Sequence, residues 1–134
     1  MSEPLPPDIR PFDLPDRALY EVVFSDQSMQ ALNRLALPEQ MRLVETISSV
    51  TSAQLRQPDE SLAHFRREGH TFYRIRAGEY RFYFEIQGAR LLCHHILHRN
   101  SLVDFIYRNR LPVTEESFAE NQNSFWKYLE SLKK

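Results

Sequence analysis

Three strand-like runs in the second half of the chain constrain its fold more than any other feature. Residues 71–76, 80–86 and 90–98 are rich in aromatic and aliphatic side chains, and three-residue connections centred on Gly78 and Gly88 separate them. Connections this short join antiparallel strands, because parallel neighbours need a crossover of about a dozen or more residues. Glycine supplies the positive φ that tight turns require. The sequence therefore predicts an antiparallel meander.

The first half of the chain has helical periodicity after one short strand. Residues 20–24 are rich in β-formers, and Ser25 follows as an N-cap signal. Apolar residues then recur at helical spacing in two segments, which Pro38 separates and Pro58 ends. We expect a strand followed by a helical hairpin, with the second helix running to about Leu55.

A last amphipathic helix is expected at the C-terminal end. Residues 102–110 are typical of a short helix that Pro112 stops, and Thr114 is the N-cap signal of the last helix. Apolar residues of this helix share one stripe, namely Phe118, Phe125, Leu129 and Leu132. The stripe must be buried, either on the sheet, where it would occlude the outer face, or in a homodimer or partner contact.

The composition indicates one domain of a cytoplasmic protein. The 134 residues suffice for a single core, and we divide them into a flexible proline-rich arm (1–16), a main domain (17–110) and a C-terminal helical extension (111–134). A single cysteine, Cys93, excludes an internal disulfide and is typical of a reducing compartment. The sequence contains no apolar run of the roughly 18 residues that a membrane span requires, and its N-terminus lacks the apolar region of a secretory signal.

Basic charge is concentrated in one segment of the chain. The net charge is −1, yet residues 61–110 contain nine arginines and no lysine against four acidic residues. Such asymmetry indicates an anionic partner for this segment. The alternative is internal pairing with residues 1–60, which contain ten acidic and five basic residues.

Alternation along the predicted strands gathers arginines on one face of the sheet. We expect the face toward the helical hairpin to bury Phe82, Phe84 and Ile75. The outward face then carries four arginines from neighbouring strands, which are Arg74, Arg76, Arg81 and Arg99. Guanidinium groups match phosphate because their fork donates two parallel hydrogen bonds.

Two aromatic residues accompany the arginines on the outward face. Phe72 and Tyr83 are expected to stack on bases of single-stranded RNA. The alternative is a solvated face, on which the arginines cover aromatic residues and pair with Glu79 and Glu85.

Histidines near the end of the last predicted strand are candidate metal ligands. A regular strand places His94 and His98 on one face, and His95 and Cys93 on the other, whereas a structural zinc site needs four convergent ligands. We expect no metal site and no cofactor, and we expect Cys93 to be a small buried residue rather than a nucleophile.

Two stretches resemble the RelE/ParE toxin superfamily: YRIRAGEYRFYFEI (73–86) and HRNSLVDFIYR (98–108). The resemblance spans roughly residues 20–110. It implies an α+β fold, in which an N-terminal strand and a helical hairpin pack on a mainly antiparallel twisted sheet, with the C-terminal helix added. RelE-like members of toxin–antitoxin systems cleave messenger RNA on the ribosome, ParE-like members act on gyrase, and an antitoxin protein neutralises them.

The resemblance also implies roles for individual residues. Arg74 and Arg76 match the basic pair that lines the RNA cleft. Arg81 and Arg99 would stabilise the charge of the phosphorane that forms when a ribose 2′-hydroxyl attacks the adjacent phosphate. His98 is the candidate for general acid–base catalysis. Tyr107, with Phe105 as its competitor, would orient the nucleophile or the base.

Some features favour an alternative function. The chain is slightly acidic, whereas phosphate attraction supplies much of the affinity of RNA-binding proteins. The interval from Arg99 to Tyr107 is also about one helical turn longer than is usual in the family. The alternative is a non-catalytic RelE-like module that binds RNA, the ribosome or a protein partner.

Overall fold

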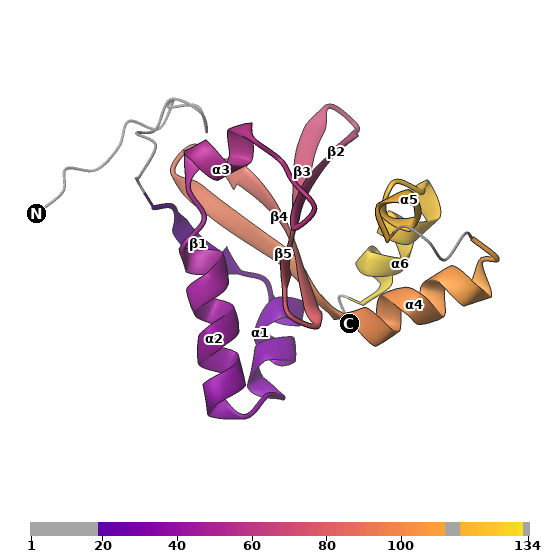
Figure 1. Cartoon of the computed structure of the whole chain (residues 1–134), viewed down its shortest axis with the longest axis horizontal. Helices are drawn as coiled ribbons and strands as arrows, with labels where there is room; N and C mark the ends of the chain where they lie inside the picture. The colour runs from indigo at the N-terminus through magenta and orange to yellow at the C-terminus, as the bar shows by residue number, and fades with distance from the viewer. Residues whose placement is uncertain (1–18, 112–115, 133–134) are drawn as a thin grey trace, which may run out of the picture.

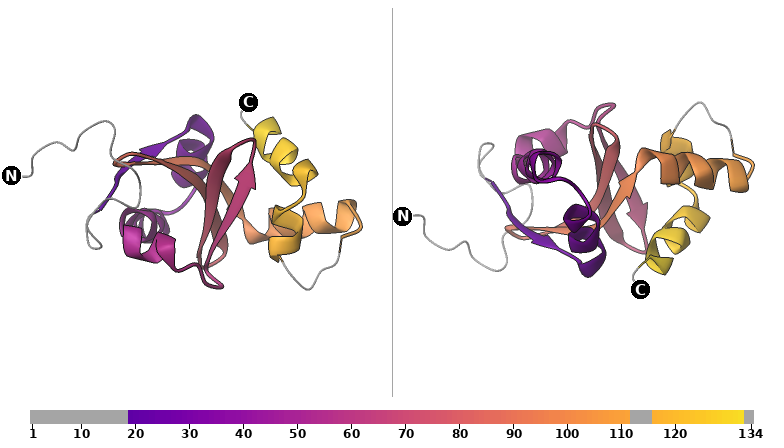
Figure 2. Two further views of the ribbon diagram at one scale, coloured as in Figure 1. Left: turned by 90° about the horizontal axis from the view of Figure 1, so that it is seen from above. Right: turned by 90° about the horizontal axis from the view of Figure 1, so that it is seen from below.

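A five-stranded sheet with helices on both faces forms the framework of the molecule (Figures 1 and 2). The computed structural model describes residues 19–111 and 116–132, so the predicted arm lies outside the described residues. The strand order is β1-β5-β4-β3-β2. The fold class is α+β, as expected.

The predicted meander is confirmed. Strands β3 (His70–Ala77), β4 (Tyr80–Gln87) and β5 (Arg90–His98) pair antiparallel in sequence order, and Gly78 and Gly88 adopt φ values of 62° and 59° in the two turns. A further strand, β2 (Leu62–Arg67), pairs antiparallel with β3. At the other edge β1 (Glu21–Phe24) pairs parallel with β5.

A register shift interrupts the pairing of β4 with β5. Tyr83 lies opposite His95, whereas Phe84 lies opposite Cys93, so that His94 is an extra residue in β5. Such a bulge re-aims side chains locally. The expectation that Cys93 and His95 share a face is therefore wrong, because Cys93 joins the core under the helical hairpin and His95 faces the opposite side with Tyr83.

Helices α1 (Asp26–Asn33), α2 (Leu37–Ser48) and α3 (Ser52–Arg56) cover one face of the sheet. Ser25 caps α1 with its side chain, as predicted, and Pro38 lies in the first turn of α2. The second predicted helix ends at Ser48 instead of near Leu55. The reason is a capping box, in which Thr51 and Gln54 begin the separate helix α3.

The first core lies between these helices and the sheet. Leu43 and Ile47 of α2 are fully buried with Phe82 and Phe84 of β4, and Ile75 lies beside them. Burial of each such side chain contributes about 1.5–3 kcal/mol. The predicted burial of Phe82, Phe84 and Ile75 is thus confirmed.

A second core lies on the opposite face, under α4 (Arg99–Arg108), α5 (Glu116–Glu120) and α6 (Asn123–Ser131). The single last helix of the prediction is two helices, since the chain turns between Glu120 and Asn123. Thr114 lies outside the described residues. Phe125 and Leu129 are fully buried, whereas Phe118 is 44% exposed, because the break removes α5 from the predicted stripe.

The apolar stripe of the last predicted helix packs on the sheet, which is the first of the two alternatives that the sequence allowed. Phe125 and Leu129 pack on the sheet of their own chain, beside Tyr83 and Leu97, and are not available to a second copy. Within residues 19–111 and 116–132, no helix has the length and apolar character needed to cross a bilayer.

Candidate functional site

The four predicted arginines do converge on one side of the sheet. Arg74 of β3 lies opposite Tyr83 of β4, and Arg76 lies opposite Arg81, so the alternation of side chains places all of them on the face of the second core. Arg99 begins α4 directly after β5. The pair of carboxylates that α5 inserts among them was not predicted.

Glu116 occupies the centre of three arginines. Its two oxygens accept hydrogen bonds from Arg81 Nε at 2.9 Å and Arg81 Nη2 at 2.8 Å, which is a bidentate pair. Arg76 Nη2 lies 3.4 Å and Arg99 Nε 3.9 Å from the same carboxylate. Burial disfavours the charged form of Glu116, but the hydrogen bonds and charge of Arg81, with the charge of Arg76, outweigh it and hold the pKa below its usual value.

Glu120 forms the second, deeper pair with Arg74. Arg74 Nε donates to both carboxylate oxygens at 3.1 Å, and its Nη1 donates to the carbonyls of Glu60 and Ser61. Tyr83 Oη donates to Glu120 Oε2 at 2.6 Å. Burial, with the adjacent Glu120 charge, raises the pKa of Tyr83 well above its usual value, and burial also raises the pKa of Glu120.

Trp126 ties α6 to the same cluster. Its indole Nε1 donates to the carbonyl of Glu120 at 2.7 Å. Helices α5 and α6 therefore contact the basic face through charge, hydrogen bonds and apolar packing together. We name Arg74, Arg76, Arg81 and Arg99 with Glu116 and Glu120 the arginine–glutamate cluster.

The expectation that the arginines face outwards is wrong for two of them. Arg74 is 1% and Arg81 4% exposed, because α5 and α6 cover them. Arg76 and Arg99 remain at the solvent edge, with 33% and 51% of their side chains exposed. The proposed pairing of arginines with Glu79 and Glu85 is replaced by pairing with α5.

A sequence signal for this closure did exist. Glu116 and Glu120 are spaced i, i+4, which places both carboxylates on one side of a helix. The missing step was to match an acidic pair at helical spacing with the arginines across two neighbouring strands.

The structure does not bring the other predicted catalytic residues to this cluster. His98 lies opposite Tyr80, packs edge-on against its ring at 4.9 Å, and accepts from the Asn100 amide as the N-cap of α4. Tyr80 packs against the first core, so His98 is directed to the face opposite Arg81. Tyr107 is 67% exposed on α4, and its competitor Phe105 is buried in the second core.

The two predicted stacking residues have different surroundings. Tyr83 is fully buried. Phe72 is partly buried and contacts Trp126, with ring centroids 5.1 Å apart. Phe72 therefore remains the one of the two with ring surface near solvent.

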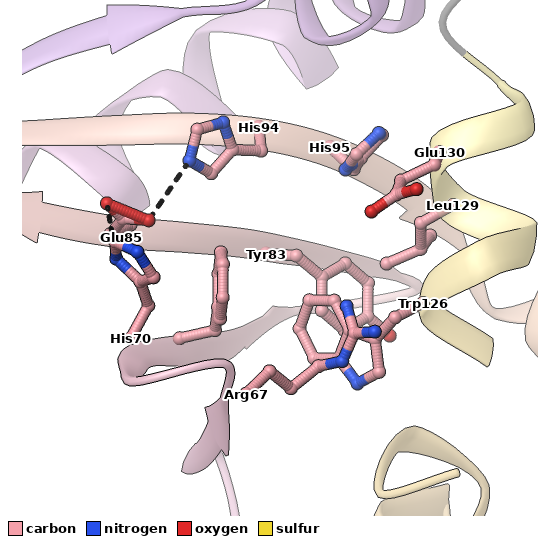
Figure 3. Close-up of a pocket in the computed structure, with 10 residues that line it drawn as sticks. Arg67, His70, Tyr83, Glu85, His94, His95, Trp126, Leu129 and Glu130 are labelled. Atoms are coloured by element: carbon pink, nitrogen blue, oxygen red, sulfur yellow. Dashed lines mark ion pairs between the residues drawn. The ribbon is translucent and has the colours of Figure 1, made fainter. Parts of the chain in front are cut away.

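A pocket of about 210 Å³ lies beside Phe72, between the sheet and α6 (Figure 3). Trp126, Leu129 and Glu130 of α6 line one side of it. The strands contribute Arg67, His70, Phe72, Tyr83, Glu85, His94 and His95. The bulge in β5 explains why two consecutive histidines both line this pocket.

The histidines of β5 do not form a metal-ligand cluster in the part of the chain that the structure describes. Among those residues no group of three or more histidine, cysteine, aspartate or glutamate side chains could hold a metal ion. Cys93 is buried in the first core, as predicted, and burial raises the pKa of its thiol to about 12.

Three solved structures with some similarity to this chain are toxin–antitoxin complexes. A chain of the archaeal RelE–RelB complex from Pyrococcus horikoshii is 19% identical, with 60% of this chain and 94% of that chain covered and a TM-score of 0.49. A chain of the RelBE toxin–antitoxin complex from Mycobacterium tuberculosis is 23% identical, with 61% of this chain and 100% of that chain covered and a TM-score of 0.46. A chain of the RelB–RelE complex from Methanococcus jannaschii is 24% identical, with 62% of this chain and 96% of that chain covered and a TM-score of 0.42.

No protein-family model matches the sequence, and no curated protein matches it. All three similarities have TM-scores below 0.5 and sequence identities below 25%.

Proposed function

We propose that this chain is a RelE-like RNA-binding protein whose basic face is closed by its own C-terminal helices. The observation that carries the proposal is the arginine–glutamate cluster, where four guanidinium groups surround two carboxylates. Carboxylates and phosphates both accept the two parallel hydrogen bonds of a guanidinium fork. Glu116 and Glu120 thus occupy the positions that RNA phosphates would take.

Binding of RNA to this face requires α5 and α6 to move. The pair Arg81–Glu116 lies nearer the solvent edge than Arg74–Glu120, because the Glu116 side chain is 17% exposed and that of Glu120 0%. An RNA strand therefore meets Arg76 and Arg99 first and competes with Glu116 for Arg81. The deeper pair with Arg74 opens only when the second core separates from the sheet.

The proposal is tested with a Glu116→Gln variant in the full chain. Removal of this charge leaves Arg81, Arg76 and Arg99 without their shared carboxylate, so RNA phosphates no longer compete with it. We expect fluorescence anisotropy to show binding of a short labelled single-stranded RNA about tenfold tighter than by the parent chain. Removal of an equal charge from the helical hairpin, by Glu45→Gln, is the matched control and should leave the affinity unchanged.

The outcome that contradicts the proposal is plain. If neither the parent chain nor Glu116→Gln binds RNA, or if Glu45→Gln strengthens binding as much, the arginines serve only to hold the C-terminal helices. A second variant sharpens the result. Arg99→Ala, at an exposed position, should remove the gain when it is combined with Glu116→Gln.

Ribosome-dependent cleavage of messenger RNA is a second candidate function. The observation that favours it is that Arg81 and Arg99 approach one oxygen, Glu116 Oε1, at 2.8 and 3.9 Å. Two guanidinium groups around one anionic oxygen suit the charge of a phosphorane. Attack of a 2′-hydroxyl on the adjacent phosphate would yield a cyclic phosphate and a 5′-hydroxyl. His98 and Tyr107 would have to approach the cluster for proton transfer.

Expression in a bacterial host separates cleavage from binding. Growth arrest with ribosome-dependent transcript cleavage, stronger for Glu116→Gln and lost with Arg99→Ala, supports the nuclease. Arg81→Ala should abolish it too, although this buried residue also holds α5. Normal growth and intact transcripts, together with RNA binding, support the non-catalytic module. A separate antitoxin partner is also proposed, and the neighbouring reading frame would reveal it.

A further inference from the structure

We infer that the pocket between the sheet and α6 binds a guanine base. The pocket lies on the same face as the arginine–glutamate cluster and adjoins it. Tyr83 and Trp126 line the pocket and also donate hydrogen bonds to Glu120 of the cluster. Since α6 supplies one of its walls, the site exists in the closed molecule. The inference therefore goes beyond the proposed function and does not depend on opening of the basic face.

Size restricts the ligand to one planar ring system. The cavity of about 210 Å³ is smaller than the roughly 300–1,000 Å³ of sites for drug-sized ligands. Its mouth is lined by exposed side chains, His70 from the sheet and Glu130 from α6, so a flat group can enter from solvent.

Aromatic rings line the pocket on several sides. Phe72 lies at the centre of a group of rings, with centroids 5.1 Å from Trp126, 6.1 Å from His94 and 6.4 Å from His70. Figure 3 shows His70, His94 and Trp126 around one open space. Aromatic side chains favour the stacking of a nucleobase on their ring faces.

Polar groups in the pocket select among the bases. Glu85 Oε2 lies 3.8 Å from His94 Nε2, and Glu85 Oε1 lies 3.9 Å from His70 Nδ1. A carboxylate therefore has an imidazole on each side. Gln87 occupies one acceptor position of Oε1, which leaves further lone pairs on both oxygens.

This arrangement is complementary to guanine. The Watson–Crick edge of guanine presents a carbonyl acceptor followed by two N–H donors, which match one imidazole N–H and the two oxygens of Glu85. Adenine presents an acceptor ring nitrogen where guanine has an N–H, so its lone pair would face the carboxylate. Sites built on such hydrogen bonds reject a mismatched ligand strongly, because their buried polar groups remain unpaired.

Arg67 is placed to meet the phosphate of a nucleotide. Its guanidinium lies 5.4 Å from the centroid of the Trp126 ring and donates to Asn123 Oδ1 at 2.6 Å. Arg67 is also one of the residues that line the pocket (Figure 3). The guanine can come from a free nucleotide or from a single-stranded RNA, and the chemistry of the base is the same in both.

Trp126 provides a direct readout, because it is the only tryptophan of the chain. Titration of the full chain with guanosine monophosphate should quench its fluorescence in a saturable manner. Inosine monophosphate, which lacks one donor, should bind more weakly, and adenosine monophosphate at least about tenfold more weakly than guanosine monophosphate. This ligand series tests the inference without any substitution.

A variant assigns the selectivity to one carboxylate. Glu85→Gln should weaken guanosine monophosphate by about tenfold or more and leave adenosine monophosphate unchanged. Glu45→Gln, on the other face of the sheet, is the matched control and should bind as the parent chain does. Circular dichroism establishes that each variant is folded.

Three results would overturn the inference: equal affinity for the guanine and adenine nucleotides, no effect of Glu85→Gln, or quenching by the diamine putrescine in place of nucleotides. A tetranucleotide with one guanine distinguishes the sources. Binding much tighter than that of guanosine monophosphate identifies RNA, and equal binding identifies a free nucleotide. Failure here leaves the proposed function intact, because no step requires RNA on the arginine–glutamate cluster.

Discussion

Arg74 has its charge almost completely removed from water. It is the largest of the fully buried side chains in the described ranges, and both its Nε and Nη1 groups donate, to Glu120 and to two carbonyls. A buried charge is tolerated only when it is paired and hydrogen-bonded. The pair is therefore sensitive to loss of either member, whatever its net contribution to stability.

Glu120→Gln tests this dependence at the level of one residue. The glutamine keeps the shape but leaves the Arg74 guanidinium without a countercharge, so the free energy of unfolding should fall by about 3–5 kcal/mol. Urea denaturation followed by circular dichroism measures it. The exposed Glu45→Gln should change stability by no more than about 0.5 kcal/mol, and an equally small loss for Glu120→Gln would contradict the assigned pairing.

Glu116 predicts a dependence of stability on pH. Its folded pKa lies below its usual value of 4.5, so its stabilisation is present above that pH and is lost as the pH falls through the folded pKa. The difference in unfolding free energy between the parent chain and Glu116→Gln should thus be constant near neutral pH and shrink in acid. A difference that grows on acidification would show that Arg81 does not hold this carboxylate.

At the level of elements, α5 and α6 depend on the second core. α5 has only five residues and α6 nine, which is too short for stable isolated helices. Their burial rests on Phe125 and Leu129 together with the pairs at Glu116 and Glu120. The sheet separates this core from the one under α1 and α2. Local opening of the C-terminal helices is therefore possible without loss of the helical hairpin.

Phe125→Ala is expected to loosen these two elements selectively. Truncation of a fully buried phenylalanine costs about 3–5 kcal/mol, and the cavity lies in the second core alone. Hydrogen exchange read by mass spectrometry should show faster exchange in peptides from α5 and α6, with protection retained in α1, α2 and β4. Equal loss of protection in both cores would mean that the chain opens as one unit.

At the scale of the whole molecule, closure masks the uneven distribution of charge. The net charge is −1 although residues 61–110 are strongly basic. Four arginines of this segment are paired with the two glutamates of α5, and the described N-terminal part contributes a long, exposed pair, Arg90–Glu21 at 3.8 Å. The basic segment is therefore paired internally, but among the described residues its carboxylate partners on this face lie in α5 and not in residues 1–60, where the alternative placed them.

Salt dependence measures how many arginines the opened face offers. Binding of single-stranded RNA releases counterions with a slope of about −0.7 per phosphate contact on a log–log plot. Glu116→Gln should therefore give a slope of about −2.1 if Arg76, Arg81 and Arg99 contact phosphates, and combination with Arg99→Ala should reduce it by about 0.7. A slope near zero would exclude this face as the RNA contact.

Local patterns in the sequence predicted much of the fold. The glycine-centred turns, the alternation along β3 and β4 and the proline between α1 and α2 all depend on near neighbours, and each prediction from them is confirmed. The end of α2 and the division of the last helix were missed, because a capping box and a two-residue turn outweigh a continuing apolar period. The bulge at His94 was missed for the same kind of reason, since one extra residue leaves no mark on strand composition.

The order of amino acids was sufficient to place Arg74, Arg76 and Arg81 on one face, because side-chain direction along a regular strand follows from position. Whether that face is exposed to solvent depends on the position of α5, which is set by packing between segments far apart in the chain. Arg74 and Glu120 are 46 positions apart, and no local preference relates them. Tertiary contact therefore converted an expected surface for RNA into a closed cluster, and it created the aromatic pocket beside it.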